Sequence, residues 1–484
     1  MPPRNLLIIA LTAVVSLACY SAASKNKYAN LFAEAMNVID QQSLQEVQPE
    51  QLFVTAMEGM LEDLDEHSIY ISGDMFKVFD EDMKQEFGGV GMFVEKDPET
   101  ENLIVLAPMP GTPAFDAGLK PGDQILAIDG TTTKSKPRRE AVKLLRGPIN
   151  ESVALTLSRG EEKFTRSLNR TIIPVASAHG DYRTPDGGWK YVLKEQPRIG
   201  YIRLIQFGEK STEEFQEALQ ATRGEIDGLI IDLRNNTGGL LDVAIEICDM
   251  FLPAELEIVN TKGRGKVILQ EFFSTADLAL DPSVPICILI NRNSASASEI
   301  LSGCLQDHDR AVLIGEQTWG KGTVQNVIPI RRGESALKLT TASYWRPSGK
   351  SIDRYDEISK QTKVWGVQPD PGFEIEMVEE ELFENMRQRN LRDLRGLLTD
   401  QESEMISRMR VYEPPTDDPD ASQDTQEPTP DPATDVTPPE ADTQNQDAEA
   451  KGLPKPKGPH VDKALQRAID HLESLTKNKT QIAA

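Results

Sequence analysis

The sequence is poor in cysteine, with four among 484 residues. Cys19 lies near the N-terminus, and the other three, Cys248, Cys287 and Cys304, are widely spaced in apolar surroundings. An odd number in such surroundings predicts buried small side chains rather than a disulfide framework. The sequence contains no CxxC pair and no Cys/His cluster, so nothing in it predicts a metal site or another cofactor.

The apolar run near the N-terminus is too short for a typical membrane span. A spanning helix needs about 20 apolar residues, whereas this run covers Leu6 to Tyr20. Arg4 precedes it and small residues follow it, which is typical of a secretory signal peptide. Residues 1–23 are therefore expected to be a signal peptide, or else an uncleaved membrane anchor or a lipid attachment site at Cys19. Each alternative predicts export to the periplasm or cell envelope, and two leave a membrane association through the N-terminus.

One long segment has no positive charge. Residues 413–450 contain twelve Asp and Glu but no Lys or Arg, about half of the formal net charge of −25. Residues 413–459 are rich in Pro, Asp and Thr, and they cannot bury enough apolar surface to offset the entropy of ordering. We therefore predict a disordered linker. The acidic balance argues against nucleic acid or an anionic membrane surface as the main partner.

The remaining chain shows several kinds of periodicity. Residues 28–86 place apolar side chains at helical spacing. Residues 173–380 alternate continuous apolar strands with helices, a pattern that predicts a mostly buried parallel sheet and hence an α/β fold. Residues 381–412 predict a charged helix. Residues 460–484 predict an amphipathic helix that docks on a partner or on the body of the protein.

Residues 87–172 are rich in Gly and Pro and predict short strands. The run FGGVGMFV (87–94) is a Gly-rich turn entering a strand, and GLKPGDQILAIDG (118–130) adds two turns around another strand. Together these runs resemble a PDZ domain of the bacterial protease type. The resemblance implies a carboxylate-binding loop at Gly89, Val90, Gly91 and Met92, with an adjacent strand that can pair with an extended peptide.

A serine-rich turn follows one of the buried strand patterns. The run NRNSASASEI (291–300) lies between VPICILI and a helical pattern. A serine in this place suits nucleophilic attack, because the first amides of the helix point toward a developing oxyanion. Ser294, Ser296 and Ser298 all fit, and each is equally compatible with a structural helix cap. Spacing alone does not choose among them.

A serine nucleophile needs a base, and the chain has only five histidines. His308 follows Ser296 by twelve residues, roughly 15 Å or more along a straight helix, so a Ser-His-Asp triad is poorly supported. Lysine can serve when its amine is neutral. Lys321 lies between two glycines that allow close backbone approach, and on a strand it shares a face with Gln325, whose amide can orient the amine.

The chain from about residue 28 to 380 resembles the carboxyl-terminal processing peptidases, also called tail-specific proteases. The motifs that carry the resemblance are LRNNTGG (233–239), NSASASEI (293–300), GEQTWGKGTVQ (315–325), EGMLEDLDEHSIYIS (58–72), KLTTASYWRPSGKSI (338–352) and VQPD (367–370). The sequence departs from the family pattern at Thr237, where Pro is frequent, and at Trp345-Arg346, where Tyr-Thr is usual.

The resemblance implies roles for individual residues. It implies Ser296 as the nucleophile, Lys321 as the general base and Gln325 as the residue that orients the base. It implies three supporting residues, which are Glu299, Asp307 and Thr318. It also implies an oxyanion hole formed by the backbone of Ala297, Gly238 and Gly239. Which glycine donates stays open at this point.

The expected fold is a multi-domain α/β protein. Its protease core would have the ββα superhelical fold of the crotonase and Clp-protease type, with an inserted PDZ-like domain and an N-terminal helical region. The expected activity is that of a serine endopeptidase acting on exported proteins with exposed C-termini, without metal or nucleotide, as a monomer or a homo-oligomer. One rival is a non-catalytic PDZ-type adaptor, which would be expected to lack Ser296 or Lys321. Another is a Ser-His hydrolase that uses His308, disfavoured by the position of that residue.

Overall fold

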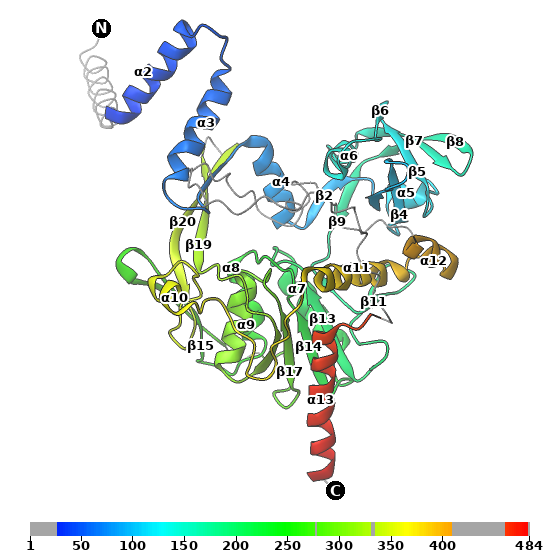
Figure 1. Cartoon of the computed structure of the whole chain (residues 1–484), viewed down its shortest axis with the longest axis vertical. Helices are drawn as coiled ribbons and strands as arrows, with labels where there is room; N and C mark the ends of the chain where they lie inside the picture. Colours follow the sequence, from blue (N-terminus) through cyan, green and yellow to red (C-terminus); the bar gives the residue numbers. More distant parts are fainter. Residues whose placement is uncertain (1–26, 276–277, 331–333, 409–459, 483–484) are drawn as a thin grey trace, which may run out of the picture. The chain divides into compact units, whose positions relative to one another are not determined.

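The computed structural model describes residues 27–275, 278–330, 334–408 and 460–482 (Figure 1). The predicted signal segment (1–23) and the predicted acidic linker (413–459) lie outside these described residues. The chain divides into two compact units, Met1–Phe76 with Asn326–Thr340 and Lys77–Gln325 with Thr341–Ala484. Among the described residues, no helix is both long enough and apolar enough to cross a membrane.

The smaller unit contains two N-terminal helices and a short β-ladder. Its elements are α2 (Lys27–Gln42), α3 (Pro49–Glu62), β1 (Ile69–Ile71) and the first part of β20 (Ser335–Trp345). β1 pairs antiparallel with β20, and Tyr70 lies opposite Leu337. The ring of Phe53 on α3 meets Tyr70 edge-on, with 5.8 Å between the ring centroids, so α3 packs on this ladder.

The larger unit is built on a five-stranded sheet of order β10-β13-β14-β17-β18. Its strands are β10 (Ala178–His179), β13 (Ile199–Leu204), β14 (Gly228–Asp232), β17 (Ile286–Ile290) and β18 (Ala311–Gly315). All run parallel except β10, which is antiparallel to β13 at one edge. Every residue of β14 and β17 is buried, as expected for a parallel sheet covered on both faces. The mixed α/β prediction is confirmed.

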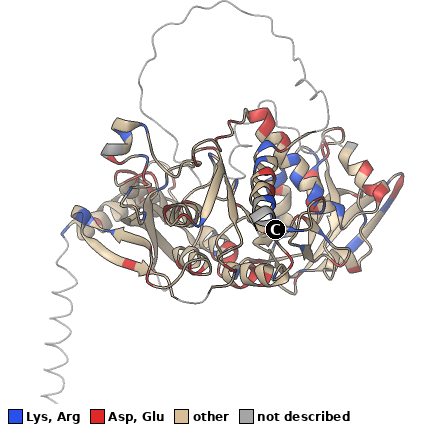
Figure 2. Ribbon diagram, turned by 90° about the horizontal axis from the view of Figure 1, so that it is seen from below, with Lys and Arg blue, Asp and Glu red and all other residues tan. Residues whose placement is uncertain are grey.

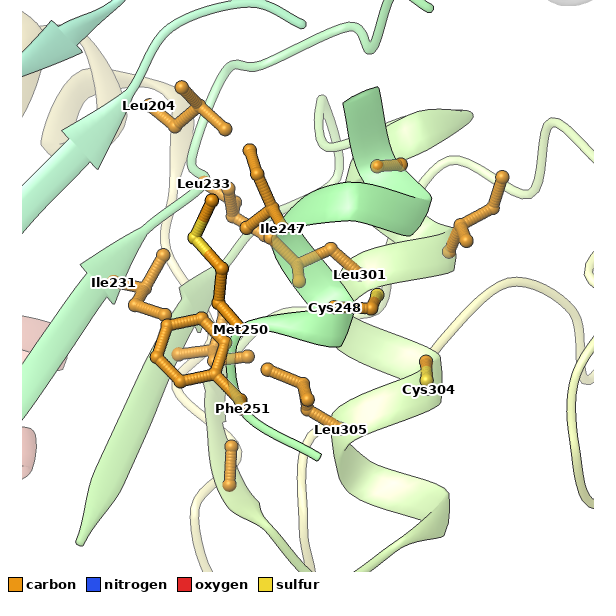
Figure 3. Close-up of a cluster of buried hydrophobic side chains, with 14 of the residues drawn as sticks. Leu204, Ile231, Leu233, Ile247, Cys248, Met250, Phe251, Leu301, Cys304 and Leu305 are labelled. Carbon is orange, nitrogen blue, oxygen red and sulfur yellow. The ribbon is translucent and has the colours of Figure 1, made fainter. Parts of the chain in front are cut away.

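Three helices cover one face of this sheet. They are α7 (Ser211–Ala221), α8 (Leu241–Asp249) and α9 (Ala297–Asp307). Their apolar sides form a buried cluster with alternate residues of the strands, and Figure 3 shows part of it between α8, α9 and the sheet. Burying one such side chain contributes about 1.5–3 kcal/mol. Cys248 and Cys304 lie in this cluster and Cys287 lies in β17, all three buried and without a disulfide, as the sequence predicts.

The opposite face of the sheet is covered by a helix from far along the chain. α13 (Lys463–Ile482), red in Figure 1, lies against β17 and β18. Its Ala464, Ala468 and Leu472 are buried against strand residues that include Tyr201 and Ile230. The predicted amphipathic helix therefore docks on the body of the protein.

The PDZ-like segment has a separate sheet of order β3-β4-β5-β7-β8, with β6 beside β5. Its strands and helices are β3 (Met92–Lys96), β4 (Leu103–Pro108), α5 (Pro113–Asp116), β5 (Gln124–Ile128), β6 (Thr131–Thr132), α6 (Arg138–Leu145), β7 (Ser152–Arg159) and β8 (Glu162–Asn169). A two-stranded ribbon of β2 (Glu86–Gly89) and β9 (Thr171–Pro174) adjoins them in sequence. The segment has its own apolar core, which includes Val90, Leu103 and Ile125.

Some further elements belong to the larger unit, and three run from one unit into the other. The strands are β11 (Tyr182–Arg183) paired with β12 (Trp189–Lys190), β15 (Glu257–Lys262) paired with β16 (Ile268–Phe273), and β19 (Thr323–Ile330) paired with β20. The helical pieces not yet named are α4 (Gly73–Met83), η1 (Arg264–Lys266) and α10 (Glu357–Thr362). The three elements that run from one unit into the other are β19, β20 and α4. The end of β20 pairs with β15, with Ser343 opposite Lys262, and it carries Tyr344 into the core.

The charged segment after the core forms two helices rather than the single helix predicted over 381–412. α11 (Glu379–Arg395) and α12 (Asp400–Arg408) are separated at residues 396–399. α11 forms ion pairs with the buried Asp181 through Arg389 and Arg392. Leu394 and Ile406 pack on the outer face of β4, so apolar packing turns the chain where charge alone predicts a continuous helix. Figure 2 shows positive and negative residues interspersed along the ribbon.

Candidate active site

The predicted nucleophile lies at a strained turn between β17 and α9. Ser296 is the residue directly before α9, and its φ of 57° and ψ of −115° are values that residues other than glycine rarely adopt. Such backbone strain is concentrated at functional sites in proteins. The side chain is largely buried, with 7% of the residue exposed. The turn therefore places one hydroxyl at the N-terminus of a buried helix.

The hydroxyls of the two neighbouring serines have structural partners. Ser294 donates to the Leu233 carbonyl at 2.8 Å, and Ser298 donates to the Asn236 carbonyl at 2.9 Å. Both residues are fully buried. The Ser294 hydroxyl joins the turn after β17 to the segment after β14, and the Ser298 hydroxyl joins the start of α9 to the same segment. The sequence leaves three serines open, and hydrogen bonding separates Ser296 from the other two.

Glu299 links the two residues predicted to form the dyad. One of its carboxylate oxygens, Oε2, accepts the backbone N–H of Ser296 at 2.8 Å and that of Lys321 at 2.9 Å. The other oxygen accepts the Thr318 hydroxyl at 2.5 Å and the Gly320 N–H at 2.7 Å. Burial raises the pKa of Glu299 to about 7, and these four hydrogen bonds act in the opposite direction. The carboxylate thereby holds the nucleophile turn and the Lys321 loop together.

The glycines beside Lys321 allow the close approach that the sequence predicts. A Cβ on Gly320 would lie 2.4 Å from the Trp365 ring, and its φ of 88° favours glycine. A Cβ on Gly322 would lie 2.3 Å from the backbone nitrogen of Asp353. Substitution at either position would push the loop away from its neighbours, so the glycines fix where the Lys321 backbone lies.

Gln325 lies on β19, which begins after Lys321. Its amide donates to the Thr323 hydroxyl at 2.8 Å, and these two residues share a face of the strand. Lys321 itself lies in the loop before β19, whereas the sequence predicts it on the same strand as Gln325. The expected contact between this amide and the Lys321 amine stays a prediction.

The turn after β14 lies against the nucleophile. Gly238 has a φ of 106°, and a Cβ there would lie 2.8 Å from the Ser296 Cβ and 3.0 Å from the Ala297 nitrogen. The Gly238 N–H donates to the Asn236 side chain at 2.8 Å. In the described part of the chain, the N–H groups of Gly239 and Ala297 have no hydrogen-bond acceptor. The prediction that the N–H groups of Gly239 and Ala297 bind an oxyanion is therefore compatible with the hydrogen bonds of the described residues, and it stays a prediction.

Asp307 and His308 lie at the other end of α9 from Ser296. Asp307 forms a buried ion pair with Arg346, at 2.5 Å, and accepts the Ser348 N–H at 3.1 Å. The His308 ring bonds the Glu257 carbonyl at 2.7 Å. The structure therefore does not bring Asp307 to the nucleophile. Its partner Arg346 is one of the positions at which this sequence departs from the family pattern.

The predicted peptide-binding loop joins β2 to β3. The Gly91 carbonyl accepts the Met109 N–H and the Thr112 hydroxyl, and the Val90 carbonyl accepts the Ala114 N–H. A Cβ on Gly91 would lie 2.4 Å from Thr112, so the turn requires glycine. Within the described chain, β3 pairs only with β4 and has one open edge. Gly89 is the last residue of β2 and Met92 is the first residue of β3, so all four predicted residues lie in or beside this loop.

Two further residues contact the site without having been predicted from the sequence. Tyr344 is buried and hydrogen-bonds the Ser296 side chain, and its own N–H donates to the Gly322 carbonyl at 2.7 Å. Burial raises the pKa of Tyr344 to about 12. Asn236 holds the Gly238 turn. Its position two residues before Gly238 is typical of an Asx turn, a usable sequence signal, whereas Tyr344 carries no signal beyond its strand.

Family models and curated relatives match most of the described chain. A family model described as Peptidase family S41 matches residues 198–371, and one described as PDZ domain matches residues 104–159. A carboxy-terminal-processing protease of Bartonella bacilliformis is 41% identical over 311 residues, covering 63% of this chain and 67% of that protein. A carboxyl-terminal-processing protease of Synechocystis is 38% identical over 323 residues, covering 64% of this chain and 71% of that protein. The solved photosystem II D1 C-terminal processing protease aligns at 25% identity with a TM-score of 0.40, covering 72% of this chain and 94% of that one.

The fold, the serine turn and these relatives define a serine-type peptidase that carries a PDZ domain. The chain belongs to peptidase family S41, in the group of C-terminal processing proteases.

Proposed function

We propose that this chain is an endopeptidase that uses Ser296 as the nucleophile and Lys321 as the general base. The observation that carries the proposal is the shared carboxylate oxygen of Glu299, which bonds the backbone N–H of both residues. The two residues come from separate loops, so one buried acceptor explains how their relative position is maintained. The commitment of the Ser294 and Ser298 hydroxyls to backbone carbonyls supports Ser296 as the reacting serine.

In the proposed reaction, the neutral Lys321 amine accepts the proton of the Ser296 hydroxyl while Oγ bonds to the scissile carbonyl carbon. The N–H groups of Gly239 and Ala297 then stabilise the oxyanion of the tetrahedral intermediate. The ammonium returns its proton to the leaving amine as the C–N bond breaks. Water hydrolyses the resulting ester with the same lysine as base. Activity is expected to rise with pH as the Lys321 amine loses its proton.

We further propose that the substrates are exported or envelope proteins with accessible C-termini, and that the PDZ domain captures these ends or gates the site. The open edge of β3 and the glycine turn before it support peptide binding by strand addition. A role outside the cytoplasm rests on the apolar N-terminal run. Fractionation of cells that produce the full-length chain tests it, and recovery of the mature protein in the cytoplasm would contradict it.

The direct test is cleavage of an unfolded protein with an apolar C-terminus by the full-length chain. We expect Ser296→Ala and Lys321→Ala to lower kcat by at least about 10³-fold, because each removes one member of the reacting pair. The exposed Ser348 and Lys350 provide matched controls, and Ser348→Ala and Lys350→Ala should cleave normally. Wild-type cleavage by either dyad variant would refute the assignment. Binding of the C-terminus without cleavage by the unmodified chain would favour the non-catalytic adaptor.

A substrate with an amidated C-terminus tests the PDZ role separately. Amidation removes the carboxylate that the Gly89–Met92 loop is proposed to bind, so KM should rise while kcat stays close to that of the free acid. Identical KM values for the two substrates would argue against end recognition by this domain.

A further inference from the structure

We infer that the C-terminal helix α13 supports the oxyanion turn of the active site, through an ion pair between Asp462 and Arg234. The inference rests on the proposed Ser296 mechanism and assigns a positioning role to a residue far from that serine in sequence. Asp462 directly precedes α13, and Arg234 lies between β14 and the glycine turn. The Arg234 Nη1 donates to the Asp462 carboxylate at 2.8 Å.

Arg234 is held by two carboxylates on different elements. Its Nε and Nη2 donate to the two oxygens of Asp232 at 2.9 and 2.6 Å, which leaves Nη1 for Asp462. Burial lowers the pKa of Arg234, but the charges of Asp232 and Asp462 raise it well above the ordinary value. Asp232 also accepts the buried Tyr201 hydroxyl at 2.7 Å. The planar guanidinium binds Asp232 with two N–H groups and Asp462 with a third in a fixed geometry, which the compact ammonium of lysine does not provide.

The backbone that follows Arg234 forms the oxyanion turn. Asn235 has a φ of 61°, and its N–H donates to the Asn291 side chain at 2.9 Å. The side chain of the next residue, Asn236, accepts the Gly238 N–H, whereas the Gly239 N–H has no acceptor among the described residues. Arg234 thus anchors the start of a short segment whose far end faces Ser296. A shift at this anchor would move the oxyanion donor relative to the nucleophile.

Asp462 has two separable functions, which makes the inference testable. Its carboxylate accepts the Leu465 N–H at 3.1 Å, so it caps α13 as well as pairing with Arg234. Serine is as good an N-cap as aspartate, but its side chain is too short to replace the carboxylate at Arg234. Asp462→Ser therefore keeps the helix cap and removes the ion pair. Asp462→Asn keeps the cap and a neutral acceptor for Arg234.

The experiment measures kcat, KM and the inhibition constant of a peptide boronate, which mimics the tetrahedral intermediate, in the full-length chain. We expect Asp462→Ser to lower kcat about tenfold, less than the 10²–10³-fold cost of losing an oxyanion donor outright. The boronate should bind weaker by the same factor, with KM unchanged. Asp462→Asn should recover part of the loss, and Arg234→Lys should behave like Asp462→Ser.

The matched control is Asp470→Asn, an exposed residue on the same helix that bonds only Gln466 among the contacts described for it. It should match wild type in kcat and in boronate affinity. Asp462→Ser with wild-type kcat and boronate affinity, at a temperature where both proteins are folded, would overturn the inference even if its melting temperature falls. Ser296→Ala, run in parallel, reports on the proposed function itself. Retained activity in that variant would refute the dyad and not the ion pair.

Discussion

Around Ser296, the side chains of Glu299 and Asn236 are buried and bonded to protein partners, whereas β3 in the PDZ domain is partly exposed along its length and has one open edge among the described residues. The buried Glu299 accepts four hydrogen bonds, and Asn236 is fully buried with both side-chain groups bonded. The difference follows from two tasks. Chemistry requires groups that are fixed before the substrate arrives, and strand addition requires backbone groups that are still available. Changes at the first site should lower kcat, and changes at the second should raise KM.

The largest effect is expected for Glu299→Gln. All four partners of this carboxylate are donors, and the amide NH2 of glutamine would face some of them while accepting from none. We expect kcat to fall by about 10³-fold, comparable to the loss of an essential electrostatic contact. Glu246→Gln, on the exposed side of α8, is the control and should have the kcat of wild type. Near-normal turnover in Glu299→Gln would show that the bridge does not hold the dyad.

The same residue predicts a pH dependence of stability. The native pKa of about 7 lies above the ordinary value of 4.5, so the native state binds a proton more tightly than the unfolded chain. This contribution to stability is complete below pH 4.5 and is lost as pH rises through 7, by about 3 kcal/mol in total. Urea unfolding at pH 5 and pH 8 should therefore show a smaller difference in Glu299→Gln than in wild type. An equal pH dependence of the free energy of unfolding in both proteins would contradict the raised pKa of Glu299.

A somewhat smaller loss is expected at Asn236. Asn236→Ala removes the acceptor of the Gly238 N–H and leaves the turn free to shift, so kcat should fall about 10²-fold. Asn236→Asp retains that acceptor but loses the donor to the Leu204 carbonyl. Its kcat should therefore lie between that of Asn236→Ala and that of wild type. Steady-state kinetics with the same substrate make the comparison. A rise in KM at constant kcat would place the residue in substrate binding instead.

On the PDZ side, Gly91→Val should raise KM about tenfold while leaving kcat near wild type, because a Cβ would clash with Thr112 and displace the loop. Gly118→Ala is a matched control, since Gly118 has a similar φ of 71° but open space around it. A short peptide that does not reach the PDZ domain should be cleaved equally by all three proteins. A fall in kcat on that peptide would mean that the loop also affects the protease core.

The smallest effect is expected for Tyr344→Phe, which removes one hydroxyl beside Ser296. A neutral hydrogen bond contributes about 1 kcal/mol, so kcat should fall only a few-fold. The pH profile should keep its shape, because the pKa of Tyr344 is about 12 and lies above the range of the assay. A displaced profile would instead make Tyr344 part of the proton transfer.

The buried strands of the core were predictable because continuous apolar runs need cover on both sides. The α/β class and the turns with Lys321 and Gly238 follow from such local patterns. The preference for Ser296 over Ser294 and Ser298 does not, because all three have the same local setting and only long-range bonds to Leu233 and Asn236 distinguish them. The break between α11 and α12 was missed for a similar reason, since it depends on packing against β4.

The docking of α13 has a consequence for the order in which the protein can be completed. β18 ends at Gly315 and α13 begins at Lys463, so the ribosome finishes all strands of the central sheet well before it makes the helix that covers their second face. At typical elongation rates this interval lasts on the order of ten seconds. During that time Tyr201 and Ile230 have no cover from α13. A nascent chain therefore exposes an apolar face of the complete sheet until α13 is made. A chaperone that shields this face would act during that interval.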